Sequence, residues 1–329
     1  QKIEHMSDKA NGLVLKKSSN NRKNLRNEIN EFTNLFVVEP SSIDPYGLVK
    51  KIDQTIRAME NRFSSFAESL SKSKDKDEVQ EINYGLRAAT GLRQIAKTVR
   101  HFVEMSKKFK NLQIAMILQM QLPIIEKIAE SELRGTEAFV NGLPIGDSIG
   151  PLIAASYIKK SKAIADEIMA DAVTINGRKC FVLKATGPAP HLGRTDEAIE
   201  KIMKSNKISR VITIDAGQKL EGEKSGSVAE GVGFAMGGVG QREMIENILL
   251  PKKIPIDSVV IKVGMDEAIM PMKKSIFESV EKAREYVEKA VERTPRGSKV
   301  IIIGVGNSSG IGNDHKTQTE VKRVVGELH

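Results

Sequence analysis

The stretch Val300-Ile301-Ile302-Ile303-Gly304-Val305-Gly306-Asn307 is apolar almost throughout and ends in small and polar residues. Runs of this kind are typical of strands that are buried on both faces. Three similar runs lie earlier in the chain, at 180–185, 210–215 and 258–264. Helical patterns accompany them, at 196–205, 241–250 and 273–293. This alternation of strand and helix predicts a three-layer α/β domain with a sheet that is mainly parallel.

The chain has 329 residues, which is enough for one large domain or two medium ones. Residues 1–45 are polar and rich in asparagine, and we expect an extended arm or linker there. Apolar residues recur at helical spacing through residues 46–143, which predicts a helical subdomain. The α/β domain then covers residues 144–329.

The composition excludes several classes of protein. The single Cys excludes a disulfide framework and a metal site built from several thiolates. The net charge of +9 is spread along the chain and only 4% of the residues are aromatic, which indicates a mildly basic surface rather than a nucleic-acid-binding face. No run of about 18 consecutive apolar residues occurs, so the sequence predicts no membrane span. Because the chain begins with Gln, we expect a processed or partial chain.

In open α/β sheets, ligands bind beyond the carboxyl ends of the strands. Four polar or glycine-rich segments follow the predicted strands, at 186–196, 215–217, 264–267 and 304–315. Tight turns and helix caps would explain each of them without a ligand. Segment 304–312 lacks the spacing of a nucleotide-binding phosphate loop. The glycine-rich segment 217–240 is long for a connection in a compact domain, and we expect a lid or binding loop there.

A further motif precedes the first of these strands, Gly146-Asp147-Ser148-Ile149-Gly150-Pro151-Leu152. Pro151 near the start of an apolar helical run predicts a helix N-terminus, with Asp147 or Ser148 as its cap. Capping explains the acid but not the two glycines that flank it.

This motif resembles the Gly-Asp-x-hydrophobic-Gly-Pro signature of germination-type spore proteases, and it is similar to the Gly-Asp-Asp-Gly-x-Gly stretch of hydrogenase-maturation proteases. The resemblance continues in order with Thr186-Gly187 and Asp196, then with the strand end 211–216, and covers about residues 144–265. It implies a hydrolase-type α/β fold, a peptide or protein substrate, and Asp147 and Asp215 as the catalytic pair.

Two neighbouring carboxylates suit hydrolysis, since one keeps a proton while the other activates water. The resemblance to the maturation proteases also implies a divalent metal, for which Asp147 and Asp215 with His191 are the candidate ligands and His315 an alternative to His191. The ligand-binding candidates are the residues of the same segments: Gly146, Gly187, His191, Arg194, Gly306, Asn307, Asp314 and His315.

In these protease families, a strand that ends in Gly-x-Gly-Asn lies directly before the Gly-Asp motif. Here a helical pattern precedes the Gly-Asp motif, and the C-terminal stretch 300–307 has the form of a strand that ends in Gly-x-Gly-Asn. We therefore predict a circular permutation, in which this last strand fills the missing place and brings Asn307 beside Asp147.

Two alternatives remain open. The stretch Gly304-Val305-Gly306-Asn307 followed by Asp314-His315 is similar to the opening of peptidyl-tRNA hydrolases, with Asp314 in place of an Arg. That resemblance implies an RNA-linked esterase or binder with a tRNA partner, in which Asn307 and His315 serve substrate binding and water activation. The second alternative is a non-catalytic scaffold that binds a small ligand.

The whole chain resembles an archaeal protein family that carries Gln119-Met120-Gln121-Leu122-Pro123 and the Pro-Ile-Gly-Asp-x-Ile-Gly-Pro stretch at 144–151. The resemblance implies a membrane-anchor helix ahead of this chain, and so a cytoplasmic protein that is held at the membrane. We expect the helical subdomain to form a homo-oligomer.

Overall fold

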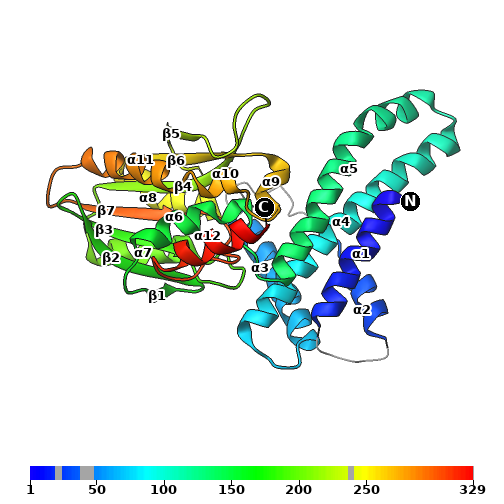
Figure 1. Cartoon of the computed structure of the whole chain (residues 1–329), viewed down its shortest axis with the longest axis horizontal. Helices are drawn as coiled ribbons and strands as arrows, with labels where there is room; N and C mark the ends of the chain where they lie inside the picture. The colour runs from blue at the N-terminus through cyan, green and yellow to red at the C-terminus, as the bar shows by residue number, and fades with distance from the viewer. Residues whose placement is uncertain (19–23, 38–47, 236–240, 329) are drawn as a thin grey trace. The chain divides into compact units, whose positions relative to one another are not determined.

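The computed structural model describes residues 1–18, 24–37, 48–235 and 241–328 (Figure 1). The chain divides into two compact units. The helical unit comprises Gln1–Val38 and Met59–Asn141, and the α/β unit comprises Glu39–Ala58 and Gly142–His329.

The helical unit is built from α1 (Lys2–Lys17), α2 (Leu25–Phe32), the later part of α3 (Leu48–Leu70), α4 (Lys76–Phe109) and α5 (Leu112–Val140). Each of these helices contributes apolar side chains to one core. The two longest begin at capped ends: Asp75 accepts hydrogen bonds from the N–H groups of the first turn of α4, and Asn111 does the same for α5. A helical region before the α/β domain is therefore confirmed.

The expectation of an extended arm over residues 1–45 is wrong for the described part, which forms α1 and α2. In α1 the buried side chains of Ile3, Met6, Ala10 and Val14 recur every three to four residues. The many polar residues between them hid this helical period in the composition. The segment around Pro40 and Pro45 lies outside the described residues.

One seven-stranded sheet forms the centre of the α/β unit, in the order β1-β2-β3-β7-β4-β6-β5. The strands are β1 (Lys162–Ala165), β2 (Ile168–Ile175), β3 (Arg178–Ala185), β4 (Arg210–Gln218), β5 (Val228–Val232), β6 (Ile256–Val263) and β7 (Lys299–Gly304). The pairs β3–β7, β7–β4 and β4–β6 are parallel, whereas β1, β2 and β5 pair antiparallel. The α/β prediction is confirmed, with a mixed sheet. The antiparallel strands lie at both edges, where the apolar signal is weakest.

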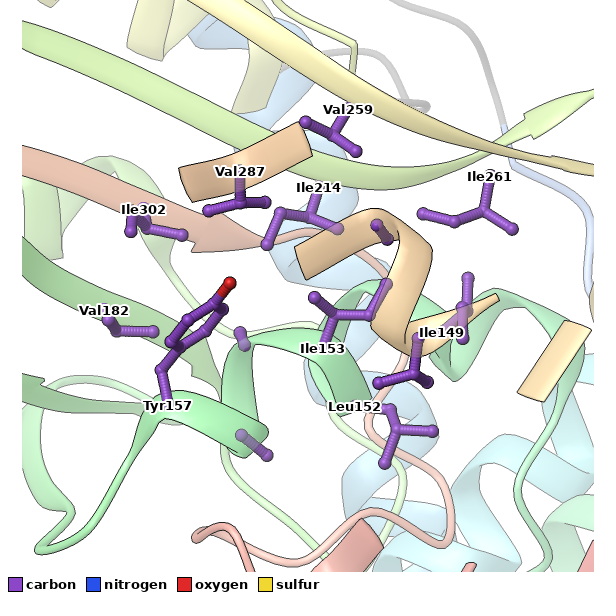
Figure 2. Close-up of a cluster of buried hydrophobic side chains, with 14 of the residues drawn as sticks. Ile149, Leu152, Ile153, Tyr157, Val182, Ile214, Val259, Ile261, Val287 and Ile302 are labelled. Carbon is purple, nitrogen blue, oxygen red and sulfur yellow. The ribbon is translucent and has the colours of Figure 1, made fainter. Parts of the chain in front are cut away.

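Helices cover both faces of this sheet, as the three-layer prediction requires. The helices that follow Asn141 are α6 (Ile149–Tyr157), α7 (Thr195–Ser205), α8 (Gln241–Leu249), α9 (Met265–Ile269), α10 (Lys274–Phe277), α11 (Val280–Glu292) and α12 (Thr317–Leu328), with the short 3-10 turns η1 (Gly146–Ser148) and η2 (Leu250–Lys252). One core joins α6, α11 and α12 to one face of the sheet. Figure 2 labels side chains of α6, α11 and four strands in this core. The other joins α7 and α8 to the opposite face. Successive residues of β7 alternate between these cores, which explains its uninterrupted apolar run.

The last strand in the chain, β7, occupies the centre of the sheet between β3 and β4. The start of α6 packs directly against it. A Cβ atom on Gly150 would overlap the carbonyl oxygen of Val305 and lie 2.5 Å from that of Ile214. Only glycine therefore lets α6 begin so close to the ends of β7 and β4.

We expect Gly150→Ala to lower the free energy of unfolding by about 1–3 kcal/mol, because two backbone segments would have to move apart. Urea denaturation of the variant measures this loss. Gly326→Ala in α12 is the matched control, since no atom lies within 4 Å of its added Cβ and alanine favours a helix. Equal stability of the two variants would contradict the close approach at Gly150.

Candidate active site at the carboxyl ends of β4 and β7

Asp147 lies in η1, the turn that leads into α6 at the carboxyl end of the sheet. Backbone surrounds it closely on two sides. A Cβ atom on Gly146 would overlap the carbonyl oxygen of Glu267, and one on Gly306 would overlap that of Asp147. Gly306 also has φ +119°, in the region that favours glycine. Close backbone packing thus explains the glycines around Asp147 that capping leaves unexplained.

The backbone N–H of Asn307 donates a hydrogen bond to Oδ2 of Asp147 over 2.7 Å. The prediction that the last strand brings Asn307 beside Asp147 is therefore confirmed. The side chain of Asn307 is buried and has a local role, because its Oδ1 accepts the N–H of Ser309. Asn307 thus orients Asp147 through its main chain.

Asp215 is the second acid of this site and lies near the end of β4, 6% exposed. Burial first, and then the negative charge of Asp147, raise its pKa to about 8, although the N–H of Ala216 opposes both effects. The two carboxyl groups are therefore close enough to interact electrostatically. At neutral pH, Asp215 keeps its proton.

Asp147 has a different environment from Asp215. Burial raises its pKa too, but the hydrogen bond from Asn307 favours the ionised form. The residue is half-buried rather than fully buried, so it keeps some contact with solvent. Each carboxyl group thus has a pKa that burial raises and one backbone N–H lowers; the two differ in exposure and in the charge of Asp147, which raises the pKa of Asp215.

The loop after β3 and the loop after β7 are joined at the same edge of the sheet. The side chain of Asn313 accepts the N–H of Gly187 and donates to its carbonyl oxygen. Ser308 accepts the N–H of His191 and donates to the carbonyl oxygen of Ala189. A Cβ on Gly187 would overlap the carbonyl oxygen of Ile311, so Gly187 serves this close packing.

His191 contacts the carboxylate of Glu167 rather than the aspartate pair, since its Nδ1 lies 2.9 Å from Oε1 of Glu167. Within the part of the chain that the structure describes, no three His, Cys, Asp or Glu side chains are grouped so that they could hold a metal ion. The structure therefore does not bring His191 together with Asp147 and Asp215 as a three-ligand site.

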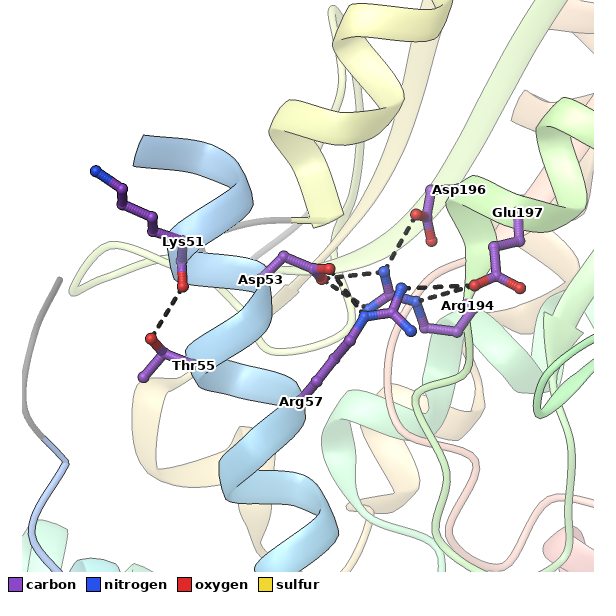
Figure 3. Close-up of polar contacts among 7 residues, drawn as sticks. All are labelled: Lys51, Asp53, Thr55, Arg57, Arg194, Asp196 and Glu197. Carbon is purple, nitrogen blue, oxygen red and sulfur yellow. Dashed lines mark hydrogen bonds and ion pairs between the residues drawn. The ribbon is translucent and has the colours of Figure 1, made fainter. Parts of the chain in front are cut away.

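Arg194 is also engaged within the protein (Figure 3). It is 7% exposed, and its guanidinium donates to Asp53 over 3.0 Å and to Asp196 over 3.2 Å. Asp53 lies in α3 and also accepts a hydrogen bond from Arg57. Arg194 therefore ties the first part of α3 to the start of α7.

The structure separates His315 from Asn307. The backbone N–H of His315 donates to the carbonyl oxygen of Ile158, just past the C-terminal end of α6, and Asp314 accepts the N–H of Lys316. Asp147 and Asn307 lie at the other end of α6, and a nine-residue helix is about 14 Å long. The Asn–His arrangement implied by the peptidyl-tRNA hydrolase resemblance is not formed.

Lys184 is a residue of this edge that the sequence reasoning missed. It is 1% exposed, and its Nζ donates to the carbonyl oxygen of Ala185 and to Oδ1 of Asn313. Burial lowers its pKa to about 7. The signal was available, since a lysine inside the apolar run 180–185 has to find polar partners.

The raised pKa of Asp215 makes stability depend on pH. The folded chain keeps this proton up to about pH 8, whereas the unfolded chain loses it near its ordinary pKa of 3.8. Stability therefore falls as pH rises through this window, by up to about 1.4 kcal/mol per pH unit.

We expect Asp215→Asn to remove this penalty, so that the variant gains stability relative to the wild type between pH 4 and about pH 8. Urea denaturation across that range measures the difference. Asp314→Asn is the control, because the carboxylate of Asp314 accepts the N–H of Lys316 and lies outside the aspartate pair. A constant difference between Asp215→Asn and the wild type would show that Asp215 is ionised at neutral pH.

Comparison with known proteins identifies a family. Residues 1–142 match the model described as "Protein of unknown function (DUF1512) N-terminal domain", and residues 145–312 match "Domain of unknown function (DUF1512) C-terminal". No curated protein and no solved structure matches the chain significantly. Together the two matches cover almost the whole chain, which belongs to the DUF1512 family.

Proposed function

We propose that this protein is a hydrolase that cleaves peptide bonds with Asp147 and Asp215 as an acid–base pair. The observation that carries the proposal is the asymmetry of the two acids. Asp147 is half-buried and receives the N–H of Asn307, whereas Asp215 is 6% exposed and burial and the charge of Asp147 raise its pKa to about 8. This is how two carboxyl groups are prepared for opposite roles near neutral pH.

The roles follow from these environments. The carboxylate of Asp147 takes a proton from water while the water oxygen attacks the carbonyl carbon of the substrate. Asp215 gives its proton to the carbonyl oxygen, which yields a neutral tetrahedral intermediate. When the intermediate collapses, the C–N bond breaks, the leaving amine takes the proton from Asp147, and Asp215 recovers its own. The products are a carboxylic acid and an amine.

The choice of a peptide bond rests on the resemblance to spore proteases and hydrogenase-maturation proteases. The place of β7 supports it, because the Gly-Val-Gly-Asn end of this strand lies beside the Gly-Asp turn in space. We infer that the α/β unit is a circular permutant of that fold. A metal-assisted version would use the same two carboxylates, but no third ligand beside them supports it among the described residues.

A proteome-derived peptide library tests the activity, with new N-termini read by mass spectrometry. We expect Asp147→Asn and Asp215→Asn each to lower the cleavage rate by at least about 100-fold, since each removes one proton-transfer step. Asp166→Asn, at an exposed carboxylate in the β1–β2 turn, is the matched control and should keep the wild-type rate.

The pH profile provides a second readout. Cleavage should decline above about pH 8, where Asp215 loses its proton. If the wild type releases no more N-termini than a folded Asp147→Asn, Asp215→Asn double variant, the proposal fails and the non-catalytic scaffold is favoured.

A further inference from the structure

The turn between α4 and α5 carries a cluster of exposed apolar side chains. We call residues 100–121 the hairpin tip (Figure 1). Its large apolar side chains are exposed by between 43% and 74%: Phe102, Phe109, Leu112, Met116, Ile117 and Met120. Single exposed apolar residues are ordinary, but six of them within 22 residues of one helical hairpin indicate an interaction site.

These side chains lie beyond the core of the helical unit. On α4, the apolar side chains that pack on this core end at Val99, and on α5 they begin at Leu122. Within the described chain, no residue of the hairpin tip belongs to the core or packs on it. The tip therefore exposes apolar surface that folding of this chain does not bury.

Only the first half of helix α5 is free to contact lipid. The helix is long and apolar enough to cross a membrane by length and composition. Its second half, however, packs inside the helical unit, where Ala129, Gly135, Thr136 and Val140 are buried. Contact with lipid would therefore be confined to the first half, which belongs to the tip.

Charge indicates which kind of surface the tip meets. The hairpin tip contains four basic residues, Arg100, Lys107, Lys108 and Lys110, and one acidic residue, Glu104, which pairs with Lys107. The three lysines are neighbours of Phe109 in the sequence, and the ammonium group of Lys108 lies over the ring of Phe109. Apolar residues flanked by lysines match a bilayer surface, where acyl chains lie below anionic headgroups.

We propose that the hairpin tip inserts its apolar side chains into the interface of a lipid bilayer with anionic headgroups. The lysines contact the headgroups, and the side chains of Phe109, Leu112 and Met116 lie at the boundary with the acyl chains. This mode is peripheral, because the rest of α5 stays in the helical core. It is independent of the aspartate pair.

The chain has no Trp, so a single introduced Trp reports on its own position. Phe109→Trp in the full chain is mixed with vesicles of phosphatidylcholine alone or with phosphatidylglycerol added. We expect a blue shift of the emission and quenching by brominated lipid with the anionic vesicles, both weakened by high salt. Leu220→Trp, at a 69% exposed site in the α/β unit, is the matched control and should show neither.

Vesicle flotation tests whether the tip carries the affinity. A Leu112→Ser, Met116→Ser, Met120→Ser variant should partition at least about tenfold more weakly than the wild type, because three of the six exposed apolar side chains become polar. Leu220→Ser should float like the wild type. Equal flotation of the two variants would overturn the proposal. A second result would also overturn it: the wild type floats with neither vesicle type, and light scattering shows a dimer for the wild type but a monomer for the tip variant. The tip would then bind a second copy of the chain.

Discussion

The candidate site depends on one steric constraint, the contact between the start of α6 and the ends of β7 and β4. At Gly150 the backbone of α6 comes so close to the carbonyl oxygens of Val305 and Ile214 that no side chain fits. Gly146 and Gly306 repeat this constraint on either side of Asp147. The contact holds the N–H of Asn307 at the carboxylate of Asp147 and keeps Asp147 near Asp215.

The constraint also explains the electrostatics. Backbone packed this closely leaves little room for water around Asp215, so its ionised form is poorly solvated and its pKa rises. Asp147 is partly exposed and accepts a backbone hydrogen bond, and both offset part of the free-energy cost of ionising a buried carboxyl group. The surrounding contacts at Glu267, Gly187 and Asn313 hold the neighbouring loops against this edge of the sheet.

Much of the α/β unit was predictable, because buried central strands such as 300–304 and 210–215 are apolar on both faces. The contact of Asn307 with Asp147 was predicted from the resemblance of the last strand to the Gly-x-Gly-Asn strand of the protease families. Helix α1 was missed because polar residues separate its buried positions, and the β1–β2 hairpin because neither strand has a continuous apolar run. The pairing of Arg194 with Asp53 joins residues 141 positions apart, which no local pattern indicates. His315 shares a motif with Asn307, but the chain turns back along α6 between them.

Titration of Asp215 by NMR, on protein with carbon-13-labelled aspartate side chains, tests the coupling of the two carboxyl groups directly. We expect a pKa of about 8 for Asp215 in the wild type and a lower pKa in Asp147→Asn, because the neighbouring negative charge is gone. A pKa of Asp215 near its ordinary value, or one unchanged in Asp147→Asn, would contradict the claim that the two carboxyl groups form a coupled pair.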